Sequence, residues 1–451
     1  MNAPGLIIAG PSSGCGKTLV TAALLRCLWQ RGVSVVAAKA GPDYIDPGFH
    51  RLASGRPCAN LDCWAMRPST LAAAVAGLHD CAELVLCEGV MGLFDGTGAD
   101  GETGSTAELA QITGWPVVLV VDAHGQGASV AALLRGFVGH RPDVSIAGVI
   151  FNRISSERHG ALLAAAVARH LPELAVLGGL ASDPALMLPS RHLGLVPASE
   201  NAGAEAIVAR AANLIGSSVD VDGLRRLARP SKLRGEVQGS RIPPLGQRIA
   251  VACDDAFCFA YPRVLEGWRN AGAELRFFSP LANQPPDPAA DAVYLPGGYP
   301  ELWAARLNAA DHFRDGLQHA AVDAKPVYGE CGGYMMLGRT LIDDAGCGHE
   351  MAGLLPLETS FRKRRLHLGY RYAALPAATA LGGIGAGFRG HEFHYATIVC
   401  EGAAEPLWAL RDAEGADLGH GGLRCGSVFG SFVHLIDSWP ALGVAEIRPL
   451  R

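Results

Sequence analysis

Short runs of apolar residues, rich in Val, Ile and Leu, alternate with helical patterns along the first half of the chain. They cover residues 6–9, 33–38, 84–87, 117–121, 146–151 and 174–177. None of these runs alternates with polar residues, so each predicts a strand buried on both faces, as in a parallel sheet covered by helices. Ligands of such sheets bind beyond the carboxyl ends of the strands, and candidate site residues are therefore sought there.

The first run is followed by Gly10-Pro-Ser-Ser-Gly-Cys-Gly-Lys-Thr18 and then by a helical pattern. Strand, glycine-rich turn and Gly-Lys-Thr in this order predict a phosphate-binding loop (P-loop) for a nucleotide. Backbone N–H groups around Gly14 and Gly16 would face phosphate, Lys17 would reach the β- and γ-phosphates, and the Thr18 hydroxyl would bind Mg²⁺. The first glycine lies one residue further from Lys17 than in the standard spacing, so an ordinary glycine-rich turn is the alternative.

Acidic residues follow two more of the predicted strands. Asp43 lies in a polar stretch after the second run, and Glu88 directly follows the third. Because Mg²⁺ prefers oxygen ligands, Thr18, Asp43 and Glu88 are the predicted metal set. A helix cap or a turn is the alternative for each acid.

Two further polar positions follow predicted strands. Asn152 comes after the fifth run, and its amide can hydrogen-bond a purine edge or form an Asx turn. The stretch 188–194 is predicted to lie near the nucleotide, with no chemistry assigned.

The second half begins a new α/β pattern at residue 248, after a Pro-, Arg-, Ser- and Gly-rich stretch that predicts a linker. A strand pattern there leads into Glu-Cys331-Gly-Gly and a helix, which is the elbow geometry of a nucleophile. The N–H groups of Gly332 and of Gly297 or Gly298 are the candidate oxyanion hole. His434, at the end of a distant apolar stretch, is the candidate general base. The alternatives are a buried core thiol and a core histidine.

Composition narrows the class of protein. The 451 residues are 49% hydrophobic and 18% charged, enough for two or three domains with large cores. The net charge of −5 argues against non-specific nucleic-acid binding, and no leader or spanning segment is found, so a cytoplasmic protein is expected without membrane association. The 12 cysteines form no CxxC pair. His391 and His394 lack a clear third ligand, so a metal site there is not expected.

Nearly the whole chain resembles the cobyrinic/hydrogenobyrinic acid a,c-diamide synthases, ATP- and glutamine-dependent amidotransferases of corrinoid (vitamin B12) biosynthesis. The most specific matching motifs are Lys39-Ala-Gly-Pro-Asp-Tyr-Ile-Asp-Pro-Gly-Phe-His50 and Glu88-Gly-Val-Met-Gly-Leu-Phe-Asp-Gly96. The resemblance implies an α/β fold in two parts. A dethiobiotin-synthetase-like P-loop domain would span residues 1–225, a linker 226–247, and a class I glutamine amidotransferase domain 248–451.

The resemblance also implies roles for particular residues. Lys17 and Thr18 would bind ATP-Mg²⁺, Asn152 would hold adenine, and Cys331 and His434 would form the glutaminase pair. The positions around the carboxylate to be activated would be Asp43, Tyr44, Ile45, Glu88 and Asp95. The substrates implied are a corrinoid carboxylic acid, ATP and glutamine, and a homodimer is expected.

One position departs from the class I pattern. A Glu usually stands two residues after the histidine, and Ile436 stands there instead. The third triad member is therefore missing or supplied otherwise, with Asp437 as a weak candidate. Amidation of a nickel-sirohydrochlorin or in the cobyric acid pathway stays an alternative, as does a P-loop switch ATPase with a non-catalytic second half. A metal-free macrocycle is favoured over a cobalt-containing one; the order of amidation and the ammonia route stay open.

Overall fold

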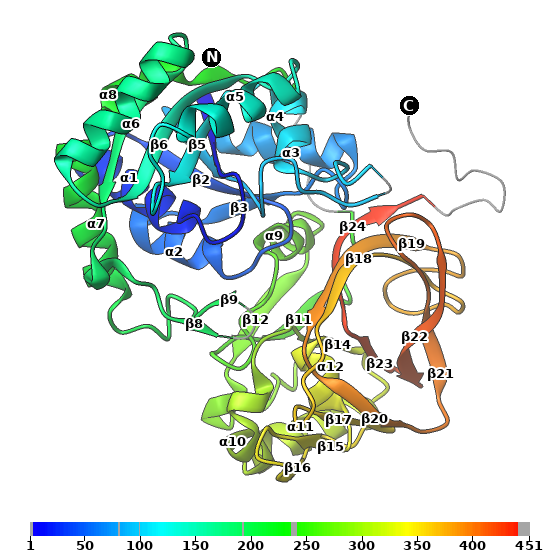
Figure 1. Ribbon diagram of the computed structural model, residues 1–451. Coiled ribbons are helices and arrows are strands. Elements are labelled where there is room, and N and C mark those ends of the chain that lie inside the picture. The colour runs from blue at the N-terminus through cyan, green and yellow to red at the C-terminus, as the bar shows by residue number, and fades with distance from the viewer. Residues whose placement is uncertain (1–2, 80–81, 99, 192–193, 236–240, 441–451) are drawn as a thin grey trace. The chain divides into compact units, whose positions relative to one another are not determined.

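The computed structural model describes residues 3–79, 82–98, 100–191, 194–235 and 241–440 (Figure 1). The chain forms two compact units, Met1–Val237 and Gln238–Arg451, and each is described by itself. The expected linker 226–247 spans this division, and its residues 236–240 lie outside the described part. Residues 229 and 230 pair with β1, so the first part of that segment packs onto unit 1.

Unit 1 is built on a parallel sheet. Its described strands are β1 (Pro4–Ala9), β2 (Val35–Ala40), β3 (Cys58–Leu61), β4 (Leu84–Glu88), β5 (Val117–Asp122), β6 (Ile146–Ile154) and β7 (Ala175–Ala181), with the short β10 (Arg229–Pro230). The order is β3-β2-β4-β1-β5-β6-β7, and only β10 pairs antiparallel in this sheet as described. The six runs predicted from sequence are all strands, and the parallel sheet is confirmed. The pattern missed the edge strand β3, because Asn60 interrupts its four residues.

Helices bury both faces of this sheet (Figure 1). They are α1 (Lys17–Gln30), α2 (Asp46–Ser54), α3 (Pro68–His79), α4 (Thr106–Thr113), α5 (Val130–His140), α6 (Glu157–His170), α7 (Ala204–Ser218) and α8 (Val221–Leu227). Leu6 and Ile8 share one core with apolar residues of α1, α7 and α8. Ile7 points to the other face and is also fully buried. Burial on both sides explains why the strands carry continuous apolar runs.

Unit 2 has a mixed sheet. Its parallel part contains β11 (Arg248–Ala252), β12 (Glu274–Phe278), β13 (Ala292–Leu295), β14 (Val327–Glu330) and β23 (Val428–Ser431). Its antiparallel part contains β22 (Asp417–Cys425), β21 (Glu405–Arg411), β18 (His367–Ala374), β19 (Gly387–His394) and β24 (Val433–Trp439). The full order is β12-β11-β13-β14-β23-β22-β21-β18-β19-β24. An α/β fold is therefore confirmed here too, with an antiparallel half.

Shorter elements complete unit 2. The helices are α9 (Pro262–Asn270), α10 (Ala304–Asn308), α11 (Asp311–Val322) and α12 (Gly332–Leu337). A small sheet contains β15 (Thr340–Ile342), β16 (Gly348–Glu350), β17 (Leu357–Ser360) and β20 (Thr397–Glu401). Among the described residues of the whole chain, no helix has the length and apolar character needed to cross a membrane.

The connection from β23 to β24 positions a key residue. The two strands stand far apart in the sheet order, yet only Phe432 separates them along the chain. The carbonyl of Ser431, the last residue of β23, accepts a 2.8 Å hydrogen bond from the Cys331 N–H. His434, near the start of β24, is thereby held close to the turn that carries Cys331.

Candidate active sites

The predicted P-loop joins β1 to α1, as expected from the sequence order. Gly14 and Gly16 have positive φ angles of 77° and 98°, which side-chain-bearing residues adopt at a cost. Gly16 is the residue before α1, so the loop ends at the N-terminus of a helix whose first N–H groups have no intrahelical acceptor. Lys17 is buried, and its Nζ donates to the Ser12 carbonyl at 2.9 Å. These are the features of a phosphate-binding cradle.

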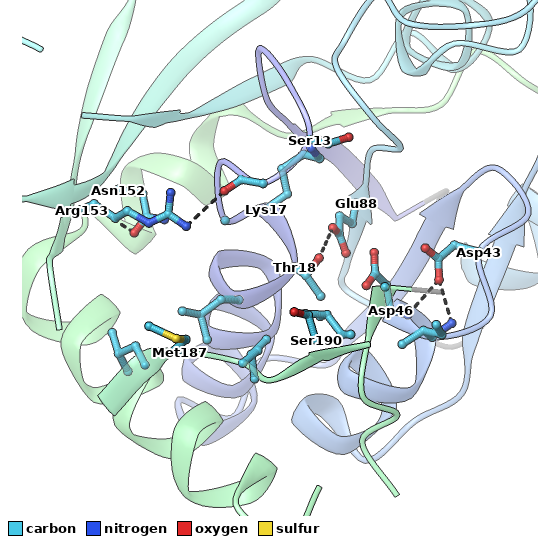
Figure 2. A pocket seen from close by; sticks show the side chains of 18 of the residues that line it. Ser13, Lys17, Thr18, Asp43, Asp46, Glu88, Asn152, Arg153, Met187 and Ser190 are labelled. Atoms are coloured by element: carbon cyan, nitrogen blue, oxygen red, sulfur yellow. Dashed lines mark hydrogen bonds between the residues drawn. The ribbon is translucent and has the colours of Figure 1, made fainter. Parts of the chain in front are cut away.

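A pocket of about 760 Å³ opens beside this loop. Figure 2 shows Asn152 and Arg153 at one end and Glu88, Asp46 and Asp43 at the other. The lining includes the predicted site residues Gly14, Gly16, Lys17, Thr18, Asp43, Ile45, Glu88 and Asn152. Leu188, Ser190 and Gly194 of the stretch 188–194 form part of the wall together with the preceding Met187, and residues 192 and 193 lie outside the described part. Tyr44 and Asp95 lie outside this lining.

Glu88 is the centre of a buried network at the end of β4. The Thr18 hydroxyl donates to Glu88 Oε1 at 2.8 Å, and the Nζ of Lys39 lies 3.2 Å from the same oxygen (Figure 2 shows the first contact). His50 Nε2 lies 2.5 Å from Glu88 Oε2. Lys39 also pairs with Asp46, with 2.6 Å between Nζ and Oδ2. A hydroxyl and a carboxylate that meet beside a P-loop are a donor set that suits Mg²⁺.

The charges of this network follow from burial and pairing. Burial alone would raise the pKa of Glu88, but the Lys39 ammonium, His50 and the Thr18 hydroxyl lower it to about 2. Burial alone would lower the pKa of Lys39, but the carboxylates of Asp46, Glu88 and Asp43 raise it above its ordinary value. Glu88 is therefore an anion and Lys39 a cation at neutral pH.

Lys39, Asp46 and His50 were not among the predicted site residues, although they lie in a motif quoted above. In the parallel register of β2 and β4, Lys39 stands directly beside Glu88. His50 is fully buried on α2 and reaches Glu88 from there. The signal in the sequence was a lysine at the end of an apolar strand, where an unpaired charge would be costly.

Asp43 and Asp95 hold turns of the backbone. Asp43 Oδ1 accepts from the N–H groups of Ile45 and Asp46 at 2.7 and 2.9 Å, which is the capping contact named as its alternative. Its carboxylate nevertheless lines the pocket. Asp95 is exposed, and its Oδ2 accepts from the Gly92 N–H at 2.8 Å. Tyr44 is half-buried.

In unit 2, Cys331 lies at a sharp turn between β14 and α12. Its φ of 48° and ψ of −102° are a sparsely populated conformation for a residue with a side chain. Its side chain is 3% exposed. A strained residue between a strand and a helix N-terminus is the elbow arrangement that the sequence predicts.

Three glycines give this turn its room. A Cβ atom on Gly297 would lie 2.3 Å from His434 Cε1 and 3.3 Å from Cys331 Cβ, so both side chains border this glycine. A Cβ atom on Gly332 would lie 3.0 Å from the Gly298 nitrogen. The structure thus brings together Cys331, His434 and the two predicted oxyanion-hole glycines, Gly298 and Gly332.

Burial controls the charges of the Cys331 and His434 pair. Burial and then the Glu301 carboxylate raise the pKa of the Cys331 thiol above its ordinary range. Burial and then the neighbouring His391 and His394 lower the pKa of His434 to about 3. The resting pair is therefore a neutral thiol and a neutral imidazole, and both pKa shifts oppose transfer of the thiol proton to His434.

A charged group lies on β18 and β19 near this site. The ligand atoms of His367, Glu392 and His394 lie within 4.8 Å of one another, so His367 is the third residue that the sequence pattern did not supply. Arg371 Nε donates to Glu392 at 2.7 Å, and His394 Nε2 lies 3.0 Å from the other carboxylate oxygen. His394 Nδ1 faces the Ala396 carbonyl at 3.0 Å. We interpret this group as a hydrogen-bonded ion network, because its carboxylate and imidazole are already engaged.

Fold and sites together define a P-loop nucleotide-binding unit and a second α/β unit with a buried cysteine–histidine pair. Family models agree with both halves. Residues 6–196 match the CobQ/CobB/MinD/ParA nucleotide binding domain, and residues 248–439 match the CobB/CobQ-like glutamine amidotransferase domain. The chain is therefore an ATP-binding ligase of the glutamine-using class.

Curated relatives identify the particular family to which the chain belongs. Proteins named hydrogenobyrinate a,c-diamide synthase from Brucella suis biovar 1 (strain 1330) and Rhizobium meliloti (strain 1021) are both 53% identical over 437 residues. These matches cover 96% of this chain and 98% and 99% of the two relatives. A solved structure described as a crystal structure of glutamine amidotransferase matches 41% of this chain and 89% of its own, at 15% identity and a TM-score of 0.29. The chain belongs to the family of hydrogenobyrinate a,c-diamide synthases.

Proposed function

We propose that this protein uses ATP and glutamine to amidate the a- and c-side-chain carboxylates of hydrogenobyrinic acid. The observation that carries the proposal is the presence of two site constellations on one chain. One is the P-loop pocket with Glu88, and the other is the buried pair Cys331 and His434. The names of relatives that are 53% identical over 96% of the chain support the choice of substrate.

The ammonia would come from glutamine at Cys331. His434 takes the thiol proton while Cys331 Sγ bonds to the amide carbon, and the Gly298 and Gly332 N–H groups stabilise the oxyanion. The C–N bond then breaks, the leaving nitrogen takes the proton from His434, and ammonia and a thioester result. Water attack on the thioester releases glutamate and restores the thiol.

The carboxylate would be activated in the P-loop pocket. A carboxylate accepts ammonia poorly because hydroxide leaves badly, and an acyl-phosphate solves this. The substrate carboxylate attacks the γ-phosphate of ATP, ADP leaves, and ammonia then displaces phosphate. Lys17 and the loop N–H groups would stabilise charge on the transferring phosphoryl group. Lys39, Asp43 and Ile45, which line this pocket, would lie beside the corrinoid carboxylate, whereas Tyr44 and Asp95 lie outside the lining.

Mg²⁺ is the proposed cofactor, with Thr18 and Glu88 as its protein ligands and Asp43 nearby. The hydroxyl and the carboxylate fit the ion, since their oxygens lie 2.8 Å apart beside the loop. The ion would neutralise negative charge on the β- and γ-phosphates. His50 and Lys39 would hold the Glu88 carboxylate in place. We propose in addition that Asn152 lies beside adenine, and that the protein is a cytoplasmic homodimer.

The test is amidation followed by mass spectrometry. The purified protein is incubated with ATP, Mg²⁺ and glutamine, and with either metal-free hydrogenobyrinic acid or cobalt-containing cobyrinic acid. Two successive acid-to-amide mass shifts, with release of ADP and glutamate, are expected, and they are expected to be faster with the metal-free macrocycle. Glutamine hydrolysis without either mass shift would mean that the amidated substrate is neither of these two macrocycles. No glutamine hydrolysis and no amidation would point to a P-loop switch with a non-catalytic second half.

A further inference from the structure

The acid that would complete the glutaminase site does not lie two residues after the histidine, as in the class I pattern, but on a different strand. Glu330 is the last residue of β14, directly before Cys331. Its carboxylate oxygen Oε2 lies 3.9 Å from His434 Nδ1, and both side chains are almost wholly buried. A Cβ atom on Gly297 would lie 2.3 and 3.1 Å from His434 Cε1 and Nε2 and 3.3 Å from Cys331 Cβ, so this edge of the imidazole and Cys331 border the same glycine. His434 thus has its two nitrogens towards different partners, as a histidine between an acid and a nucleophile requires.

Glu330 is held rigidly by groups from three strands. The hydroxyl of Tyr294 on β13 donates to Oε2 at 2.7 Å, and that of Tyr328 on β14 donates to Oε1 at 2.9 Å. The N–H of Leu435, the residue after His434, donates to Oε1 at 3.1 Å. The carboxylate is therefore tied to the backbone that carries the histidine. Three hydrogen bonds to a buried carboxylate fix its position, because each of them would be lost if the side chain moved.

We propose, on the basis of the proposed glutaminase function, that Glu330 is the positioning acid of His434. In this role Glu330 does the work of the class I glutamate, whose usual position is occupied by Ile436 in this chain. When His434 takes the thiol proton it becomes a cation, and Glu330 stabilises that cation and keeps Nε2 directed at Cys331. The resting separation of 3.9 Å exceeds a hydrogen bond, and the new charge on His434 draws the two groups together.

Asp437 is the rival candidate. It is fully buried on β24, and it stands opposite Arg389 of β19 beyond an irregularity in the register. The two candidates can be told apart by mutation, because Glu330 approaches His434 from the end of β14, next to Cys331, whereas Asp437 lies on the same strand as His434.

The experiment measures glutamine hydrolysis by the full chain, with Glu330→Gln and Asp437→Asn compared. Glu330→Gln keeps the size and an acceptor oxygen but removes the charge. Its kcat is expected to fall about 100-fold with the KM for glutamine within about 2-fold, as for the loss of the acid that orients the general base and stabilises its charged form. Asp437→Asn is expected to change kcat less than about 3-fold on the same grounds. The reverse pattern would overturn the proposal and assign the role to Asp437.

Two further variants separate positioning from a structural role. Tyr328→Phe removes one hydrogen bond to Glu330 but keeps the carboxylate, so kcat is expected to stay within about 3-fold. An equal loss in Tyr328→Phe and Glu330→Gln would mean that Glu330 only supports the fold, and would overturn the proposal. If Glu330→Gln does not fold, Glu330→Asp takes its place, with an expected kcat loss of about 10-fold.

A pH profile gives an independent readout. Burial raises the pKa of Glu330 to about 7 against the opposing effect of Tyr294, Leu435 and Tyr328. Glu330 faces Tyr294, Tyr328 and His434, and His434 in turn faces His391, Glu392 and His394. The wild-type kcat is expected to fall as the pH drops below about 7, and this limb is expected to disappear in Glu330→Gln. An unchanged limb would overturn the proposal. If the wild type hydrolyses glutamine but does not amidate the corrinoid, the proposed substrate is wrong. The role of Glu330 in glutamine hydrolysis can still be tested in that case.

Discussion

The side-chain amide of Asn152, at the end of β6, donates a 3.0 Å hydrogen bond to the carbonyl oxygen of Cys15 in the P-loop. The Asn152 oxygen accepts from the Arg153 N–H at 3.0 Å, and the Nη2 of Arg153 donates to the Gly14 carbonyl at 3.1 Å. The end of β6 therefore supports the P-loop directly. The adenine contact proposed for Asn152 adds to a structural task that the sequence did not indicate.

The first prediction concerns this support. Asn152→Asp replaces the donor by a carboxylate that faces the Cys15 carbonyl at a buried position. The loop is expected to loosen, and the KM for ATP in the amidation assay to rise about 10-fold. Asn213→Asp, at an exposed position on α7, is the control and is expected to leave KM unchanged. An unchanged KM in Asn152→Asp would mean that this hydrogen bond does not shape the loop.

The second prediction separates the two chemistries. Cys331→Ala removes the nucleophile, so glutamine-dependent amidation is expected to fall at least about 10³-fold. Amidation with added ammonium salt is expected to stay near the wild-type rate, because the P-loop pocket is untouched. Cys347→Ala, at an exposed cysteine, serves as the control. Equal losses with glutamine and with ammonia would contradict the assignment of Cys331.

The third prediction concerns the acid at the end of β4. Glu88→Gln removes the charge that faces Thr18, Lys39 and His50. Ammonia-dependent amidation is expected to fall about 10²- to 10³-fold, the size of losing one electrostatic contact to the reacting groups. Glutamine hydrolysis is expected to be unchanged. Glu157→Gln, at an exposed position on α6, is the matched control, and a similar loss there would argue against a specific role.

The fourth prediction uses the absence of a side chain at Gly297. In Gly297→Ala the new methyl group would fall 2.3 Å from His434 Cε1, so the imidazole has to move away from Cys331. Glutamine hydrolysis is expected to fall about 10²-fold, as expected when a general base is displaced. Gly383→Ala, where a Cβ atom would have nothing within 4 Å, is expected to behave as wild type. Wild-type hydrolysis by Gly297→Ala would mean that this imidazole is not the base.

The fifth prediction is a pH dependence of stability. The pKa of His434 falls from 6.5 to about 3 on folding, because burial and then His391 and His394 disfavour its charged form. Between these values the unfolded chain binds more protons, so this contribution is fully present above pH 6.5 and is lost as the pH falls towards 3. The loss is at most about 1.4 kcal/mol per pH unit. Urea unfolding at several pH values should therefore show a smaller acid loss in His434→Asn, and equal slopes would contradict the burial of a neutral imidazole.

Local features of this protein were readable from the chain. The P-loop and the Cys331 elbow are contiguous segments, and in the P-loop Gly14 and Gly16 are needed for their positive φ angles. The apolar runs of unit 1 follow from burial on both faces of a parallel sheet. Such features depend on neighbours a few residues away, and a sequence displays those neighbours.

The partners of the acids were decided only by the tertiary structure. Glu88 meets Lys39 because β2 and β4 are neighbours in a fixed register. Glu330 reaches His434 because β14 pairs with β23, and β24 begins only one residue after β23 ends. A sequence pattern identifies a triad acid by its spacing from the histidine, so the presence of Ile436 at the usual position indicated that the third triad member was missing. The free energy of burying a carboxylate depends instead on which donors and cations the strand order brings around it, and that order is a property of the folded chain.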